Sequence, residues 1–545
     1  MVTYEDVPQR FNVARYFLHR HLEEGRADRV SLYCGDRAVT YRELAELSNR
    51  TAHVLRELGV EPEDRVLLAL SDGVEFVAAW YAVVGMGAVS AEVYTYLHAH
   101  DYAYYLDYAR PRVVLTDATT HGRVREAARE VGFRGRLLAV GVSELEPGEV
   151  DFHHVVSRAP VEPILADTSK DQFALWKFTT GTTGRPKAVV HCHYAPYLSF
   201  WNYAQEVIRY TPEDVVLPVP KLFFGYARDC TALFPFGVGA AGVVFPERST
   251  PERIFELVAR YRPTVLVQVP TMMRAMVDHP EAHRYDLSCV RLATSAGEAL
   301  PAELYARWKQ TFGVEVVDGI GSSELYHIYV SNRPGEVRSG SVGRPCPGYR
   351  AEVRDPEGHP VPAGEVGELW VWGETAAVMY WLDRAKSVRT FHGNWVRTGD
   401  LFRQDADGFL WYQGRADDLM KVGGVWVAPL EVEECLLQHP LVRECAVVPE
   451  LREGLTLPVA YVAPREPAQP GPDLARQLQQ HVREHLSPHK YPREVRFVEA
   501  LPRTPSGKVD RRKLREAAEA SGAAAEPSGP VTASSLEHRA DRLHE

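Results

Sequence analysis

The chain has 545 residues, enough for several folded domains with large apolar cores. Hydrophobic residues make up 45% of it and charged residues 25%, which is typical of a globular protein and excludes a mostly disordered chain. The net charge of −11 repels phosphate polymers and anionic lipids, so we expect neither nucleic acid nor a membrane among its partners.

Cysteine usage and the first residues indicate the compartment. The seven cysteines are widely scattered and include no CxxC pair, so we expect reduced thiols rather than a zinc or redox motif. The chain begins MVTYEDVPQRFNV, without a basic stretch followed by an apolar run, and it contains no run of 18 apolar residues. We therefore expect a cytoplasmic protein.

Strands and helices are predicted to alternate along the first part of the chain. Apolar residues recur at helical spacing over residues 38–58, and a short apolar strand over 65–70 precedes a helical segment over 76–86. Further strands are expected at 112–116, 242–246, 264–269, 290–295 and 314–318, and helices at 251–261 and 301–312. This alternation predicts a mainly parallel sheet with helices on both faces.

The composition changes near residue 335. Residues 339–412 are rich in Gly and Pro and carry short strands at 350–354 and 367–371, which predicts a β-rich subdomain. From residue 417 onwards the pattern becomes αββαβ, with helices at 431–438 and 474–486 and strands at 444–449, 459–463 and 494–497. The predicted fold class is α/β, with a large N-terminal domain over 1–416, a small α+β C-terminal domain over 417–516 and a disordered tail over 517–545.

The sharpest motif is the loop TTGTTGRPK over residues 179–187, directly after the apolar segment 173–178. Its hydroxyl groups, glycines and lysine are the parts with which a backbone wraps a polyphosphate. A Walker A loop ends in Gly-Lys-Ser or Gly-Lys-Thr, whereas here Pro186 precedes Lys187 and Ala188 follows it. The motif therefore indicates a different kind of phosphate loop.

Four further segments complete a family pattern: SAGEA at 295–299, DGIGSSE at 318–324, TGD at 398–400 and PSGK at 505–508. Together with the phosphate loop, they make the chain similar to the adenylate-forming superfamily of acyl- and aryl-CoA ligases, nonribosomal adenylation domains and luciferases. The resemblance covers residues 10–515 and departs mildly at Ala188, where glycine is usual, and at Ser323, where threonine is commoner. It implies a mobile C-terminal domain that rotates between two half-reactions.

The resemblance also implies an ATP site. The loop at 179–187 would hold the β- and γ-phosphates, and the segment at 295–299 would pack against adenine. Asp400 would accept hydrogen bonds from both ribose hydroxyls, because a carboxylate accepts two donors at once, and Glu324 would help to hold Mg²⁺. The implied ATP-binding residues are Thr179, Thr180, Gly181, Thr182, Thr183, Gly184, Lys187, Gly297, Glu298, Ala299, Asp318, Gly319, Ser323, Glu324, Asp400, Arg415 and Lys508.

Three charged residues are expected to take part in catalysis: Lys508, Glu324 and Lys187. Attack of a carboxylate on the α-phosphate of ATP builds negative charge, which a nearby cation stabilises without forming a bond. The resemblance further implies a hinge at Asp417. It also implies a tunnel for the pantetheine arm of CoA, lined by Lys421, Gly423, Gly424 and Trp426.

The segments KLFFGY at 221–226 and LYHI at 325–328 resemble the benzoate-CoA ligase branch more than the fatty-acyl or amino-acid branches. A pocket built from them would be short and flat, which suits an aromatic ring. The expected pocket residues are Phe224, Gly225, Tyr226, Arg228, Asp229, Gly321, His327 and Ile328.

Arg228 and Asp229 depart from the pattern of that branch, which has a small, glycine-rich continuation there. Two adjacent charges in the pocket would favour a ring that bears hydroxyl or amino groups. Neighbouring residues of a helix point about 100° apart, so the alternative is that the pair leaves the pocket for the surface.

The expected function is that of an AMP-forming aryl-CoA ligase, which uses ATP, Mg²⁺ and CoA to convert an aromatic acid into its CoA thioester through aryl-AMP. Two alternatives share the nucleotide motifs. One is transfer of the aryl group to a carrier protein, and the other is activation of another oxyanion, such as nitrite in diazo formation on an aminoaryl acid. Dimers are common among relatives, which leaves a homodimer open.

Overall fold

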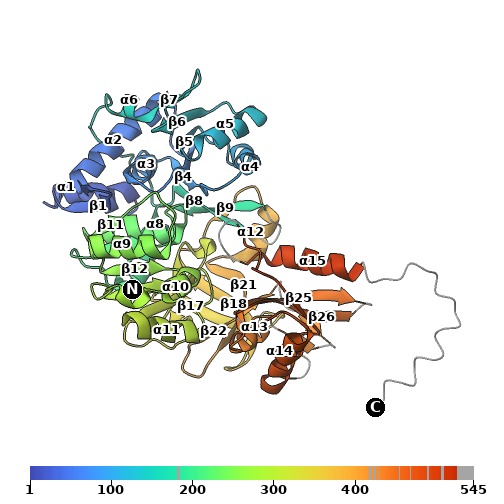
Figure 1. Cartoon of the computed structure of the whole chain (residues 1–545). Coiled ribbons are helices and arrows are strands. Elements are labelled where there is room, and N and C mark those ends of the chain that lie inside the picture. The colour runs from blue at the N-terminus through green and yellow to red at the C-terminus, as the bar shows by residue number, and fades with distance from the viewer. Residues whose placement is uncertain are drawn as a thin grey trace, which may run out of the picture. The chain divides into compact units, whose positions relative to one another are not determined.

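The computed structural model describes residues 1–180, 185–416, 420–422, 425–427, 429–452, 455–466, 468–487, 490–504 and 509–523. The chain divides into two compact units, Met1–Tyr412 and Gln413–Glu545 (Figure 1). The predicted division, between residues 416 and 417, lies a few residues further along the chain.

The first unit contains a sheet of eight strands in the order β19-β9-β8-β4-β3-β5-β6-β7. Strands β8 to β7 of this order run parallel, whereas β9 and β19 are antiparallel to their neighbours. The strands are β3 (Arg65–Ala69), β4 (Val89–Glu92), β5 (Val113–Asp117), β6 (Arg136–Val140), β7 (Val150–Asp151), β8 (Phe173–Thr180), β9 (Pro186–Cys192) and β19 (Met379–Tyr380). The helices before β8 are η1 (Tyr4–Asp6), η2 (Arg15–His19), α1 (Arg20–Glu23), α2 (Tyr41–Glu57), α3 (Val74–Gly85), α4 (Ala99–Ala109), α5 (His121–Glu130) and α6 (Phe152–Val156).

A second sheet of the same unit has nine strands in the order β16-β15-β14-β13-β12-β10-β11-β1-β2, and its central strands β14 to β1 are parallel. The strands are β1 (Val30–Cys34), β2 (Arg37–Thr40), β10 (Val215–Pro218), β11 (Ala241–Val243), β12 (Val265–Gln268), β13 (Leu292–Ser295), β14 (Val316–Gly321), β15 (Ile328–Ser331) and β16 (Arg344–Pro345). The helices between them are α7 (Tyr194–Ser199), η3 (Phe200–Ile208), α8 (Gly225–Ala232), η4 (Pro235–Gly237), α9 (Pro251–Tyr261), α10 (Pro270–Val277), η5 (Ala282–Arg284), α11 (Ala302–Phe312) and η6 (Ser323–Leu325).

Capping residues decide where helices begin. The Thr40 hydroxyl accepts the N–H of Glu43 at 3.1 Å, and the Glu43 carboxylate accepts the N–H of Thr40 at 2.8 Å, which is a capping box. Helix α2 therefore starts at Tyr41, and the prediction of a helix from residue 38 is wrong over 38–40, which belong to β2. Helix α9 begins at Pro251 as predicted, because a proline fits the first helical position.

The predicted β-rich subdomain is confirmed as an antiparallel sheet in the order β17-β18-β21-β20, with β22 paired to β21. Buried and half-buried residues alternate along β18, as in a strand with one face on the core. The elements are β17 (Tyr349–Arg354), β18 (Val366–Gly373), α12 (Arg384–Thr390), β20 (Phe391–His392), β21 (Trp395–Gln404) and β22 (Leu410–Arg415).

The second unit has its own apolar core. Leu474, Leu478 and Val482 are spaced by one helical turn on α14, and they pack with Val432 and Leu436 of α13 against a three-stranded sheet. The elements are β23 (Met420–Val422), β24 (Val425–Val427), α13 (Pro429–Leu437), β25 (Val442–Arg452), β26 (Leu455–Pro464), α14 (Pro472–His485), β27 (Glu494–Phe497) and α15 (Arg511–Ala523). The boundary of the predicted tail at residue 517 falls inside α15, and residues beyond 523 lie outside the described part of the chain.

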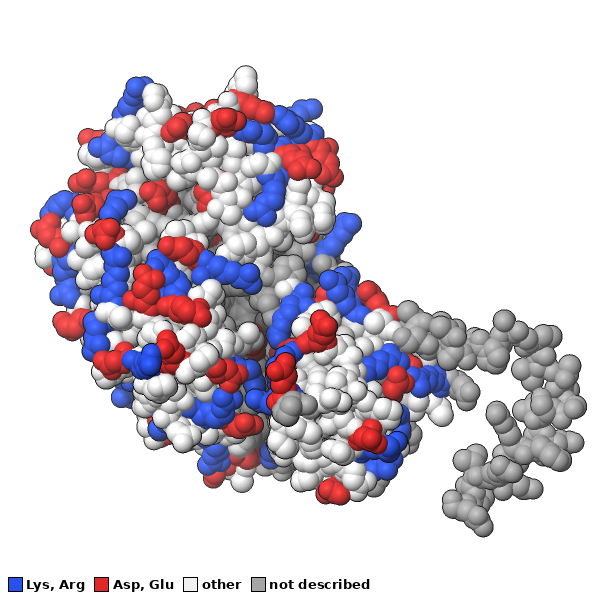
Figure 2. Space-filling view, viewed as in Figure 1, with Lys and Arg blue, Asp and Glu red and all other residues white. Residues whose placement is uncertain are grey.

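The predicted fold class is confirmed: parallel α/β sheets, a β-rich region and a separate α+β unit at the C-terminal end. Within the described residues, no helix is long and apolar enough to cross a membrane. Basic and acidic side chains are interspersed on the face of the first unit that Figure 2 shows.

Candidate active site

The phosphate loop joins two paired strands. Residues Thr179 and Thr180 end β8 and stand opposite Lys187 and Pro186 of β9, so the loop closes an antiparallel hairpin. The four residues at its tip, Gly181, Thr182, Thr183 and Gly184, lie outside the described residues. Lys187 therefore has a fixed position at the base of the loop.

Lys187 is tied to the start of α12. Its Nζ forms an ion pair of 3.0 Å with Oδ2 of Asp383, which caps that helix by accepting the N–H of Lys386. Partial burial opposes ionisation of Asp383, but the hydrogen bond from Lys386 and the charge of Lys187 hold its pKa below the usual value. Burial, followed by the nearby Lys187 cation, lowers the pKa of Lys386. Asp383 thus accepts both the ammonium group of Lys187 and the backbone N–H of Lys386.

Glu324 lies on the short helix η6, close to the same region. Its Oε1 accepts the hydroxyl of Tyr380 at 2.6 Å, and Tyr380 belongs to β19, directly before α12. The carbonyl oxygen of the preceding Ser323 accepts Nε2–H of His191, which lies on β9. Burial, followed by the Lys177 cation, lowers the pKa of His191 to about 3, so the ring is neutral.

The carboxyl ends of β13 and β14 carry buried polar groups. Ser295 and Asp318 are neighbours in register at this edge of the parallel sheet, and Gly319 follows in β14. Asp318 Oδ1, Ser295 Oγ and Ser322 Oγ make no hydrogen bond of normal geometry within the described residues, although the Ser295 hydroxyl is near enough to Asp318 to favour the ionised form of its carboxyl group. Burial raises the pKa of Asp318 well above its ordinary value. Ligands of open α/β sheets bind at such carboxyl ends, where unpaired polar groups can meet them.

The segment after β13 is a turn. Gly297 has a positive φ of 87°, and the next residue, Glu298, accepts hydrogen bonds from the N–H and hydroxyl of Thr271 at 3.2 and 2.6 Å. Ala299 follows, exposed. Glu298 thus ties the turn after β13 to α10.

Asp400 is positioned by a bulge in β21. Between the pairs Glu368–Leu401 and Trp370–Arg397 the register shifts, so residues 398–400 bulge from the strand. Gly399 has a φ of 72°, which an L residue rarely adopts, and the N–H of Asp400 donates to the hydroxyl of Thr398 at 3.1 Å. A bulge changes the direction in which side chains leave a strand, and the Asp400 residue here is 9% exposed.

Arg228 and Asp229 are both buried on α8, which excludes the alternative that they lie on the surface. Arg228 pairs with Glu92 of β4, and it also donates to Asp229 Oδ1 through Nε at 2.9 Å and Nη2 at 2.7 Å. Asp229 Oδ2 accepts Lys177 Nζ of β8 at 2.7 Å. These two acids and two bases form the buried charge network, and their formal charges balance.

The pKa shifts follow from this arrangement. Burial alone would raise the pKa of Asp229, but Arg228 and Lys177 bring it down to about 2. Burial lowers the pKa of Lys177 to about 8, although the Asp229 carboxylate opposes the shift. Because all four charges have protein partners, a bare aromatic ring would leave none of them unpaired. The prediction that Arg228 and Asp229 favour a ring with a polar substituent assumed that they lack a partner. The geometry does not support it.

Lys177 also connects the network to the turn that carries Glu324. Its Nζ donates to the carbonyl oxygen of Tyr326 at 2.6 Å, and Tyr326 has a φ of 71°, a strained value for this residue type. A Cβ atom on Gly225 would lie 2.8 Å from Lys177 Nζ. Glycine at the start of α8 therefore leaves the space that the ammonium group occupies.

Aromatic rings surround His327. The ring centroids of Tyr203, Tyr226 and Phe234 lie 5.3, 5.7 and 4.8 Å from it. Burial lowers the pKa of His327 to about 3, and its Nδ1 has no hydrogen-bond partner within the described residues. A neutral imidazole thus presents one unused nitrogen inside an aromatic cluster.

The other predicted pocket residues lie on the elements next to this cluster. The Tyr226 hydroxyl lies 2.6 Å from Oγ1 of Thr294 in β13, which ties α8 to the sheet. Phe224 precedes α8 and its ring is 5.9 Å from that of Tyr94. Gly321 ends β14 and the buried Ile328 begins β15.

The remaining predictions concern the end of β22 and the second unit. Arg415 ends β22, and Lys421 and Trp426 are paired residues of the hairpin β23-β24. Lys508, Asp417, Gly423 and Gly424 lie outside the described residues.

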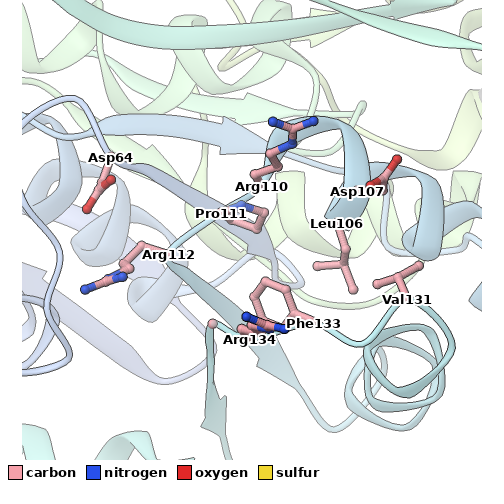
Figure 3. Close-up of a pocket in the computed structure, with 10 residues that line it drawn as sticks. Asp64, Leu106, Asp107, Arg110, Pro111, Arg112, Val131, Phe133 and Arg134 are labelled. Carbon is pink, nitrogen blue, oxygen red and sulfur yellow. The ribbon is translucent and has the colours of Figure 1, made fainter.

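A surface pocket of about 320 Å³ lies elsewhere in the first unit (Figure 3). It is lined by residues before β3, β5 and β6 and by the end of α4, including Asp64, Asp107, Arg110, Arg112 and Phe133. These are the amino ends of parallel strands, the edge opposite to the one where ligands of such sheets bind. None of the predicted site residues lines it.

Comparison with known proteins identifies the family. Residues 18–381 match the AMP-binding enzyme family and residues 431–508 match the AMP-binding enzyme C-terminal domain. The first match spans more than half of the chain, so this chain belongs to the AMP-binding enzyme family, and the resemblance seen in the motifs is confirmed.

Relatives and solved structures agree with this assignment. The 4-hydroxybenzoate-CoA/benzoate-CoA ligase of Rhodopseudomonas palustris is 37% identical over 93% of this chain and 94% of its own length. The structure of the anthranilate CoA ligase AuaEII in complex with anthranoyl-AMP matches with a TM-score of 0.90 and 34% identity, over 96% of this chain and all of that one. A benzoate CoA ligase from Burkholderia xenovorans LB400 matches with a TM-score of 0.85 and 38% identity, over 93% of this chain and all of that one.

Several residues of this region escape the sequence patterns. Two of them can be noticed in the sequence, because a polar residue interrupts an apolar run. They are Lys177, between Trp176 and Phe178, and His191, between Val190 and Cys192. No sequence pattern marks Glu92, Tyr380 or Asp383, because each meets its partner only through tertiary packing.

Proposed function

We propose that this chain is an AMP-forming aryl-CoA ligase, which joins an aromatic carboxylic acid to AMP and then transfers the aryl group to the thiol of CoA. The observation that carries the proposal is the edge formed by β13, β14 and η6. There the buried, unpartnered oxygens of Ser295, Asp318 and Ser322 lie on the elements that lead to Glu324. Family membership and the CoA ligases among the relatives support the same reaction.

In the first half-reaction, a carboxylate oxygen of the acid attacks the α-phosphorus of ATP. The new O–P bond forms as the bond to pyrophosphate breaks, and negative charge grows on the phosphate oxygens. We assign stabilisation of that charge to Lys187 and Lys508, while Thr179, Thr180 and the tip of the phosphate loop hold the β- and γ-phosphates. The ion pair with Asp383 keeps Lys187 at the base of the loop until a phosphate competes for it.

We assign Mg²⁺ binding to Glu324. Its carboxylate is half-buried and oriented by the Tyr380 hydroxyl, and hard oxygen ligands of this kind suit Mg²⁺, which usually takes one or two carboxylates plus phosphate oxygens. When bound, the ion would neutralise charge on the phosphates.

The nucleoside is assigned to the remaining residues of the pattern. Gly297, Glu298 and Ala299 would pack against adenine, Asp318, Gly319 and Ser323 would contact the nucleotide from β14 and η6, and Asp400 and Arg415 would bind the ribose side. The bulge at residues 398–400 supports the role of Asp400, because it turns the carboxylate out of the regular strand direction.

In the second half-reaction, the CoA thiol attacks the carbonyl carbon of aryl-AMP, the C–S bond forms, AMP leaves with the bonding electrons and the thiol proton is released. We assign the tunnel for the pantetheine arm to Lys421, Gly423, Gly424 and Trp426, and the hinge between the two reaction states to Asp417.

The acid is proposed to be a benzoate-like ring with a hydroxyl or amino group. The aromatic residues Phe224 and Tyr226 supply flat contact area, and Nδ1 of the neutral His327 is a hydrogen-bond group left free for a ring substituent. In this proposal the buried charge network shapes the wall of the pocket rather than binding the substituent. The relatives named above act on hydroxybenzoate, benzoate or anthranilate, which supports this class.

A panel of benzoates, hydroxybenzoates and aminobenzoates, assayed for pyrophosphate release with and without CoA, tests the function. We expect ATP-dependent pyrophosphate release with ring acids and an aryl-CoA product when CoA alone is supplied. Aryl-AMP that accumulates and never reaches CoA would indicate a carrier protein as acceptor. Pyrophosphate release only with nitrite, or with no acid at all, would reject acid activation.

The Lys508→Ala variant tests whether this lysine serves the first half-reaction alone. We expect adenylation to fall by about 10² to 10³, the usual loss for one transition-state donor, while thioester formation from supplied aryl-AMP is largely retained. Equal losses in both steps would reject the assignment of Lys508.

A further inference from the structure

The second unit contains a cluster of thiol and imidazole groups that the proposed reaction does not use. Cys435 of α13 and His481 and His485 of α14 each offer one possible ligand atom, and these atoms lie within 4.8 Å of one another. His481 and His485 are one helical turn apart, so they project from the same face of α14. Two elements that are distant in the sequence thus bring one sulfur and two nitrogens together.

The hydrogen bonds of the two rings leave one nitrogen on each ring available as a ligand. His481 Nε2 lies 3.0 Å from the carbonyl oxygen of Cys435, and His485 Nδ1 lies 2.8 Å from the carbonyl oxygen of His481. A carbonyl oxygen only accepts, so these ring nitrogens carry the protons. The lone pairs then belong to Nδ1 of His481 and Nε2 of His485. Metal-bound histidines share this pattern, in which one ring nitrogen donates to a carbonyl and the other binds the metal.

We propose that Cys435, His481 and His485 form a Zn²⁺ site that links α13 to α14. One thiolate and two imidazoles are a ligand set that suits Zn²⁺, whereas Mg²⁺ and Ca²⁺ require oxygen ligands. With three protein ligands, water occupies the fourth position. The site is separate in residues and in metal chemistry from the Mg²⁺ position assigned to Glu324.

The geometry requires only a small adjustment. Tetrahedral Zn²⁺, with bonds of about 2.1 Å to nitrogen and 2.3 Å to sulfur, places its ligand atoms about 3.4 to 3.7 Å apart. The ligand atoms already lie within 4.8 Å of one another, so they need to approach by at most about 1 Å, and the exposed His485 side chain has room to move. The ring of His439 packs edge-on against His481, with centroids 5.3 Å apart, and holds that ring in place.

Zinc binding to the full-length protein, purified without an affinity tag and stripped with a chelator, tests the site. Titration against a chromophoric chelator should show one Zn²⁺ per chain, and Zn²⁺ should raise the Tm because it binds the folded state. Co²⁺ should give a thiolate-to-metal charge-transfer band, which reports Cys435 directly.

Three variants distinguish this site from non-specific binding of Zn²⁺ to surface imidazoles. Cys435→Ser and His485→Ala should each weaken Zn²⁺ binding by at least about tenfold, since losing a group that merely orients a ligand already costs that much. Cys435→Ser should also remove the charge-transfer band. Cys445→Ser, a second buried cysteine of the same unit, should change neither.

His485 is exposed, so the His485→Ala variant should fold normally. It therefore tests the site even if Cys435→Ser is unstable. Stoichiometric metal without a thiolate band, wild-type affinity in His485→Ala, or no Zn²⁺ bound at equimolar addition would each overturn the proposal.

Discussion

The first unit contains two regions of buried polar groups that differ in whether the groups have protein partners. In the buried charge network, every charge of Glu92, Lys177, Arg228 and Asp229 has a protein partner, and the formal charges cancel. At the carboxyl ends of β13 and β14, in contrast, Asp318 and Ser295 keep polar atoms without a partner in the described chain. Buried groups with protein partners hold the fold together, whereas those without a partner are left for a ligand.

The physical cause is the cost of taking charge out of water. A buried ion pair is tolerated when each partner compensates the other, and it becomes strongly destabilising when one partner is lost. An unpartnered buried carboxyl group lowers stability in the absence of ligand, and it gains most when a ligand supplies the missing bond. The network should therefore respond to mutation in stability, and the sheet edge in ATP binding.

The largest effect is expected for Lys177→Met. Removing this cation leaves Arg228 as the one base between Glu92 and Asp229, so the free energy of unfolding should fall by about 3 to 5 kcal/mol. Urea unfolding at pH 7 measures it. Arg262→Gln breaks an exposed ion pair with Asp286 and should leave stability nearly unchanged.

The double variant Lys177→Met/Asp229→Leu sharpens this test. It removes one charge of each sign and leaves Arg228 with Glu92, so it should recover most of the lost stability, because apolar replacement of a whole buried pair is often neutral. A double variant that is as unstable as the sum of both single variants would show that charge balance is not the cause.

The next effect concerns His191, which lies beside the network. Its pKa is about 3 in the folded chain and about 6.5 when unfolded, so between these values the unfolded state binds a proton that the folded state does not. Stability is then full above pH 6.5 and falls as the pH is lowered through this window. His191→Gln, which keeps a donor for Ser323, should remove about 1.6 kcal/mol of the loss between pH 6.5 and pH 5.

Urea unfolding at several pH values measures this difference. Other buried histidines titrate in the same direction, so the wild-type slope should exceed one proton; they are His19, His21, His193 and His327. An unchanged slope in His191→Gln would mean that His191 is protonated in the folded chain.

At the sheet edge, Asp318→Asn should have the reverse signature. The neutral amide is easier to bury than an ionised carboxylate, so stability should be equal or higher, while the KM for ATP rises about tenfold because one acceptor oxygen is lost. ATP-pyrophosphate exchange and urea unfolding measure the two effects. A less stable variant with an unaltered KM would place Asp318 with the structural groups.

The smallest effect is expected for Tyr380→Phe. It removes the hydroxyl that donates to Glu324 at 2.6 Å, and we expect a loss of about threefold to tenfold in adenylation, with half-saturation shifted to higher Mg²⁺. Tyr81→Phe removes a buried hydroxyl bonded to the carbonyl of Ala232 and serves as the control. If both variants show the same Mg²⁺ dependence, the Tyr380 hydroxyl has no part in Mg²⁺ binding.

Local sequence determined much of this protein. The helix at Pro251–Tyr261 follows from an apolar spacing and a proline start, and the β-rich region follows from its Gly and Pro content with short strands. The motifs identified the family because the order of short chemical segments is a property of the chain alone. The start of α2 was missed since a capping box outweighs the apolar spacing that continues before it.

Tertiary structure decided which charged groups meet. Arg228 and Asp229 are neighbours in the sequence, but their partners Glu92 and Lys177 come from β4 and β8, strands that the sheet brings together. The spacing of His481 and His485 is visible in the sequence, whereas Cys435 joins them only because α13 packs on α14. Periodicity reports which residues are buried, but the balance of buried charges depends on contacts between distant segments, and folding alone fixes those.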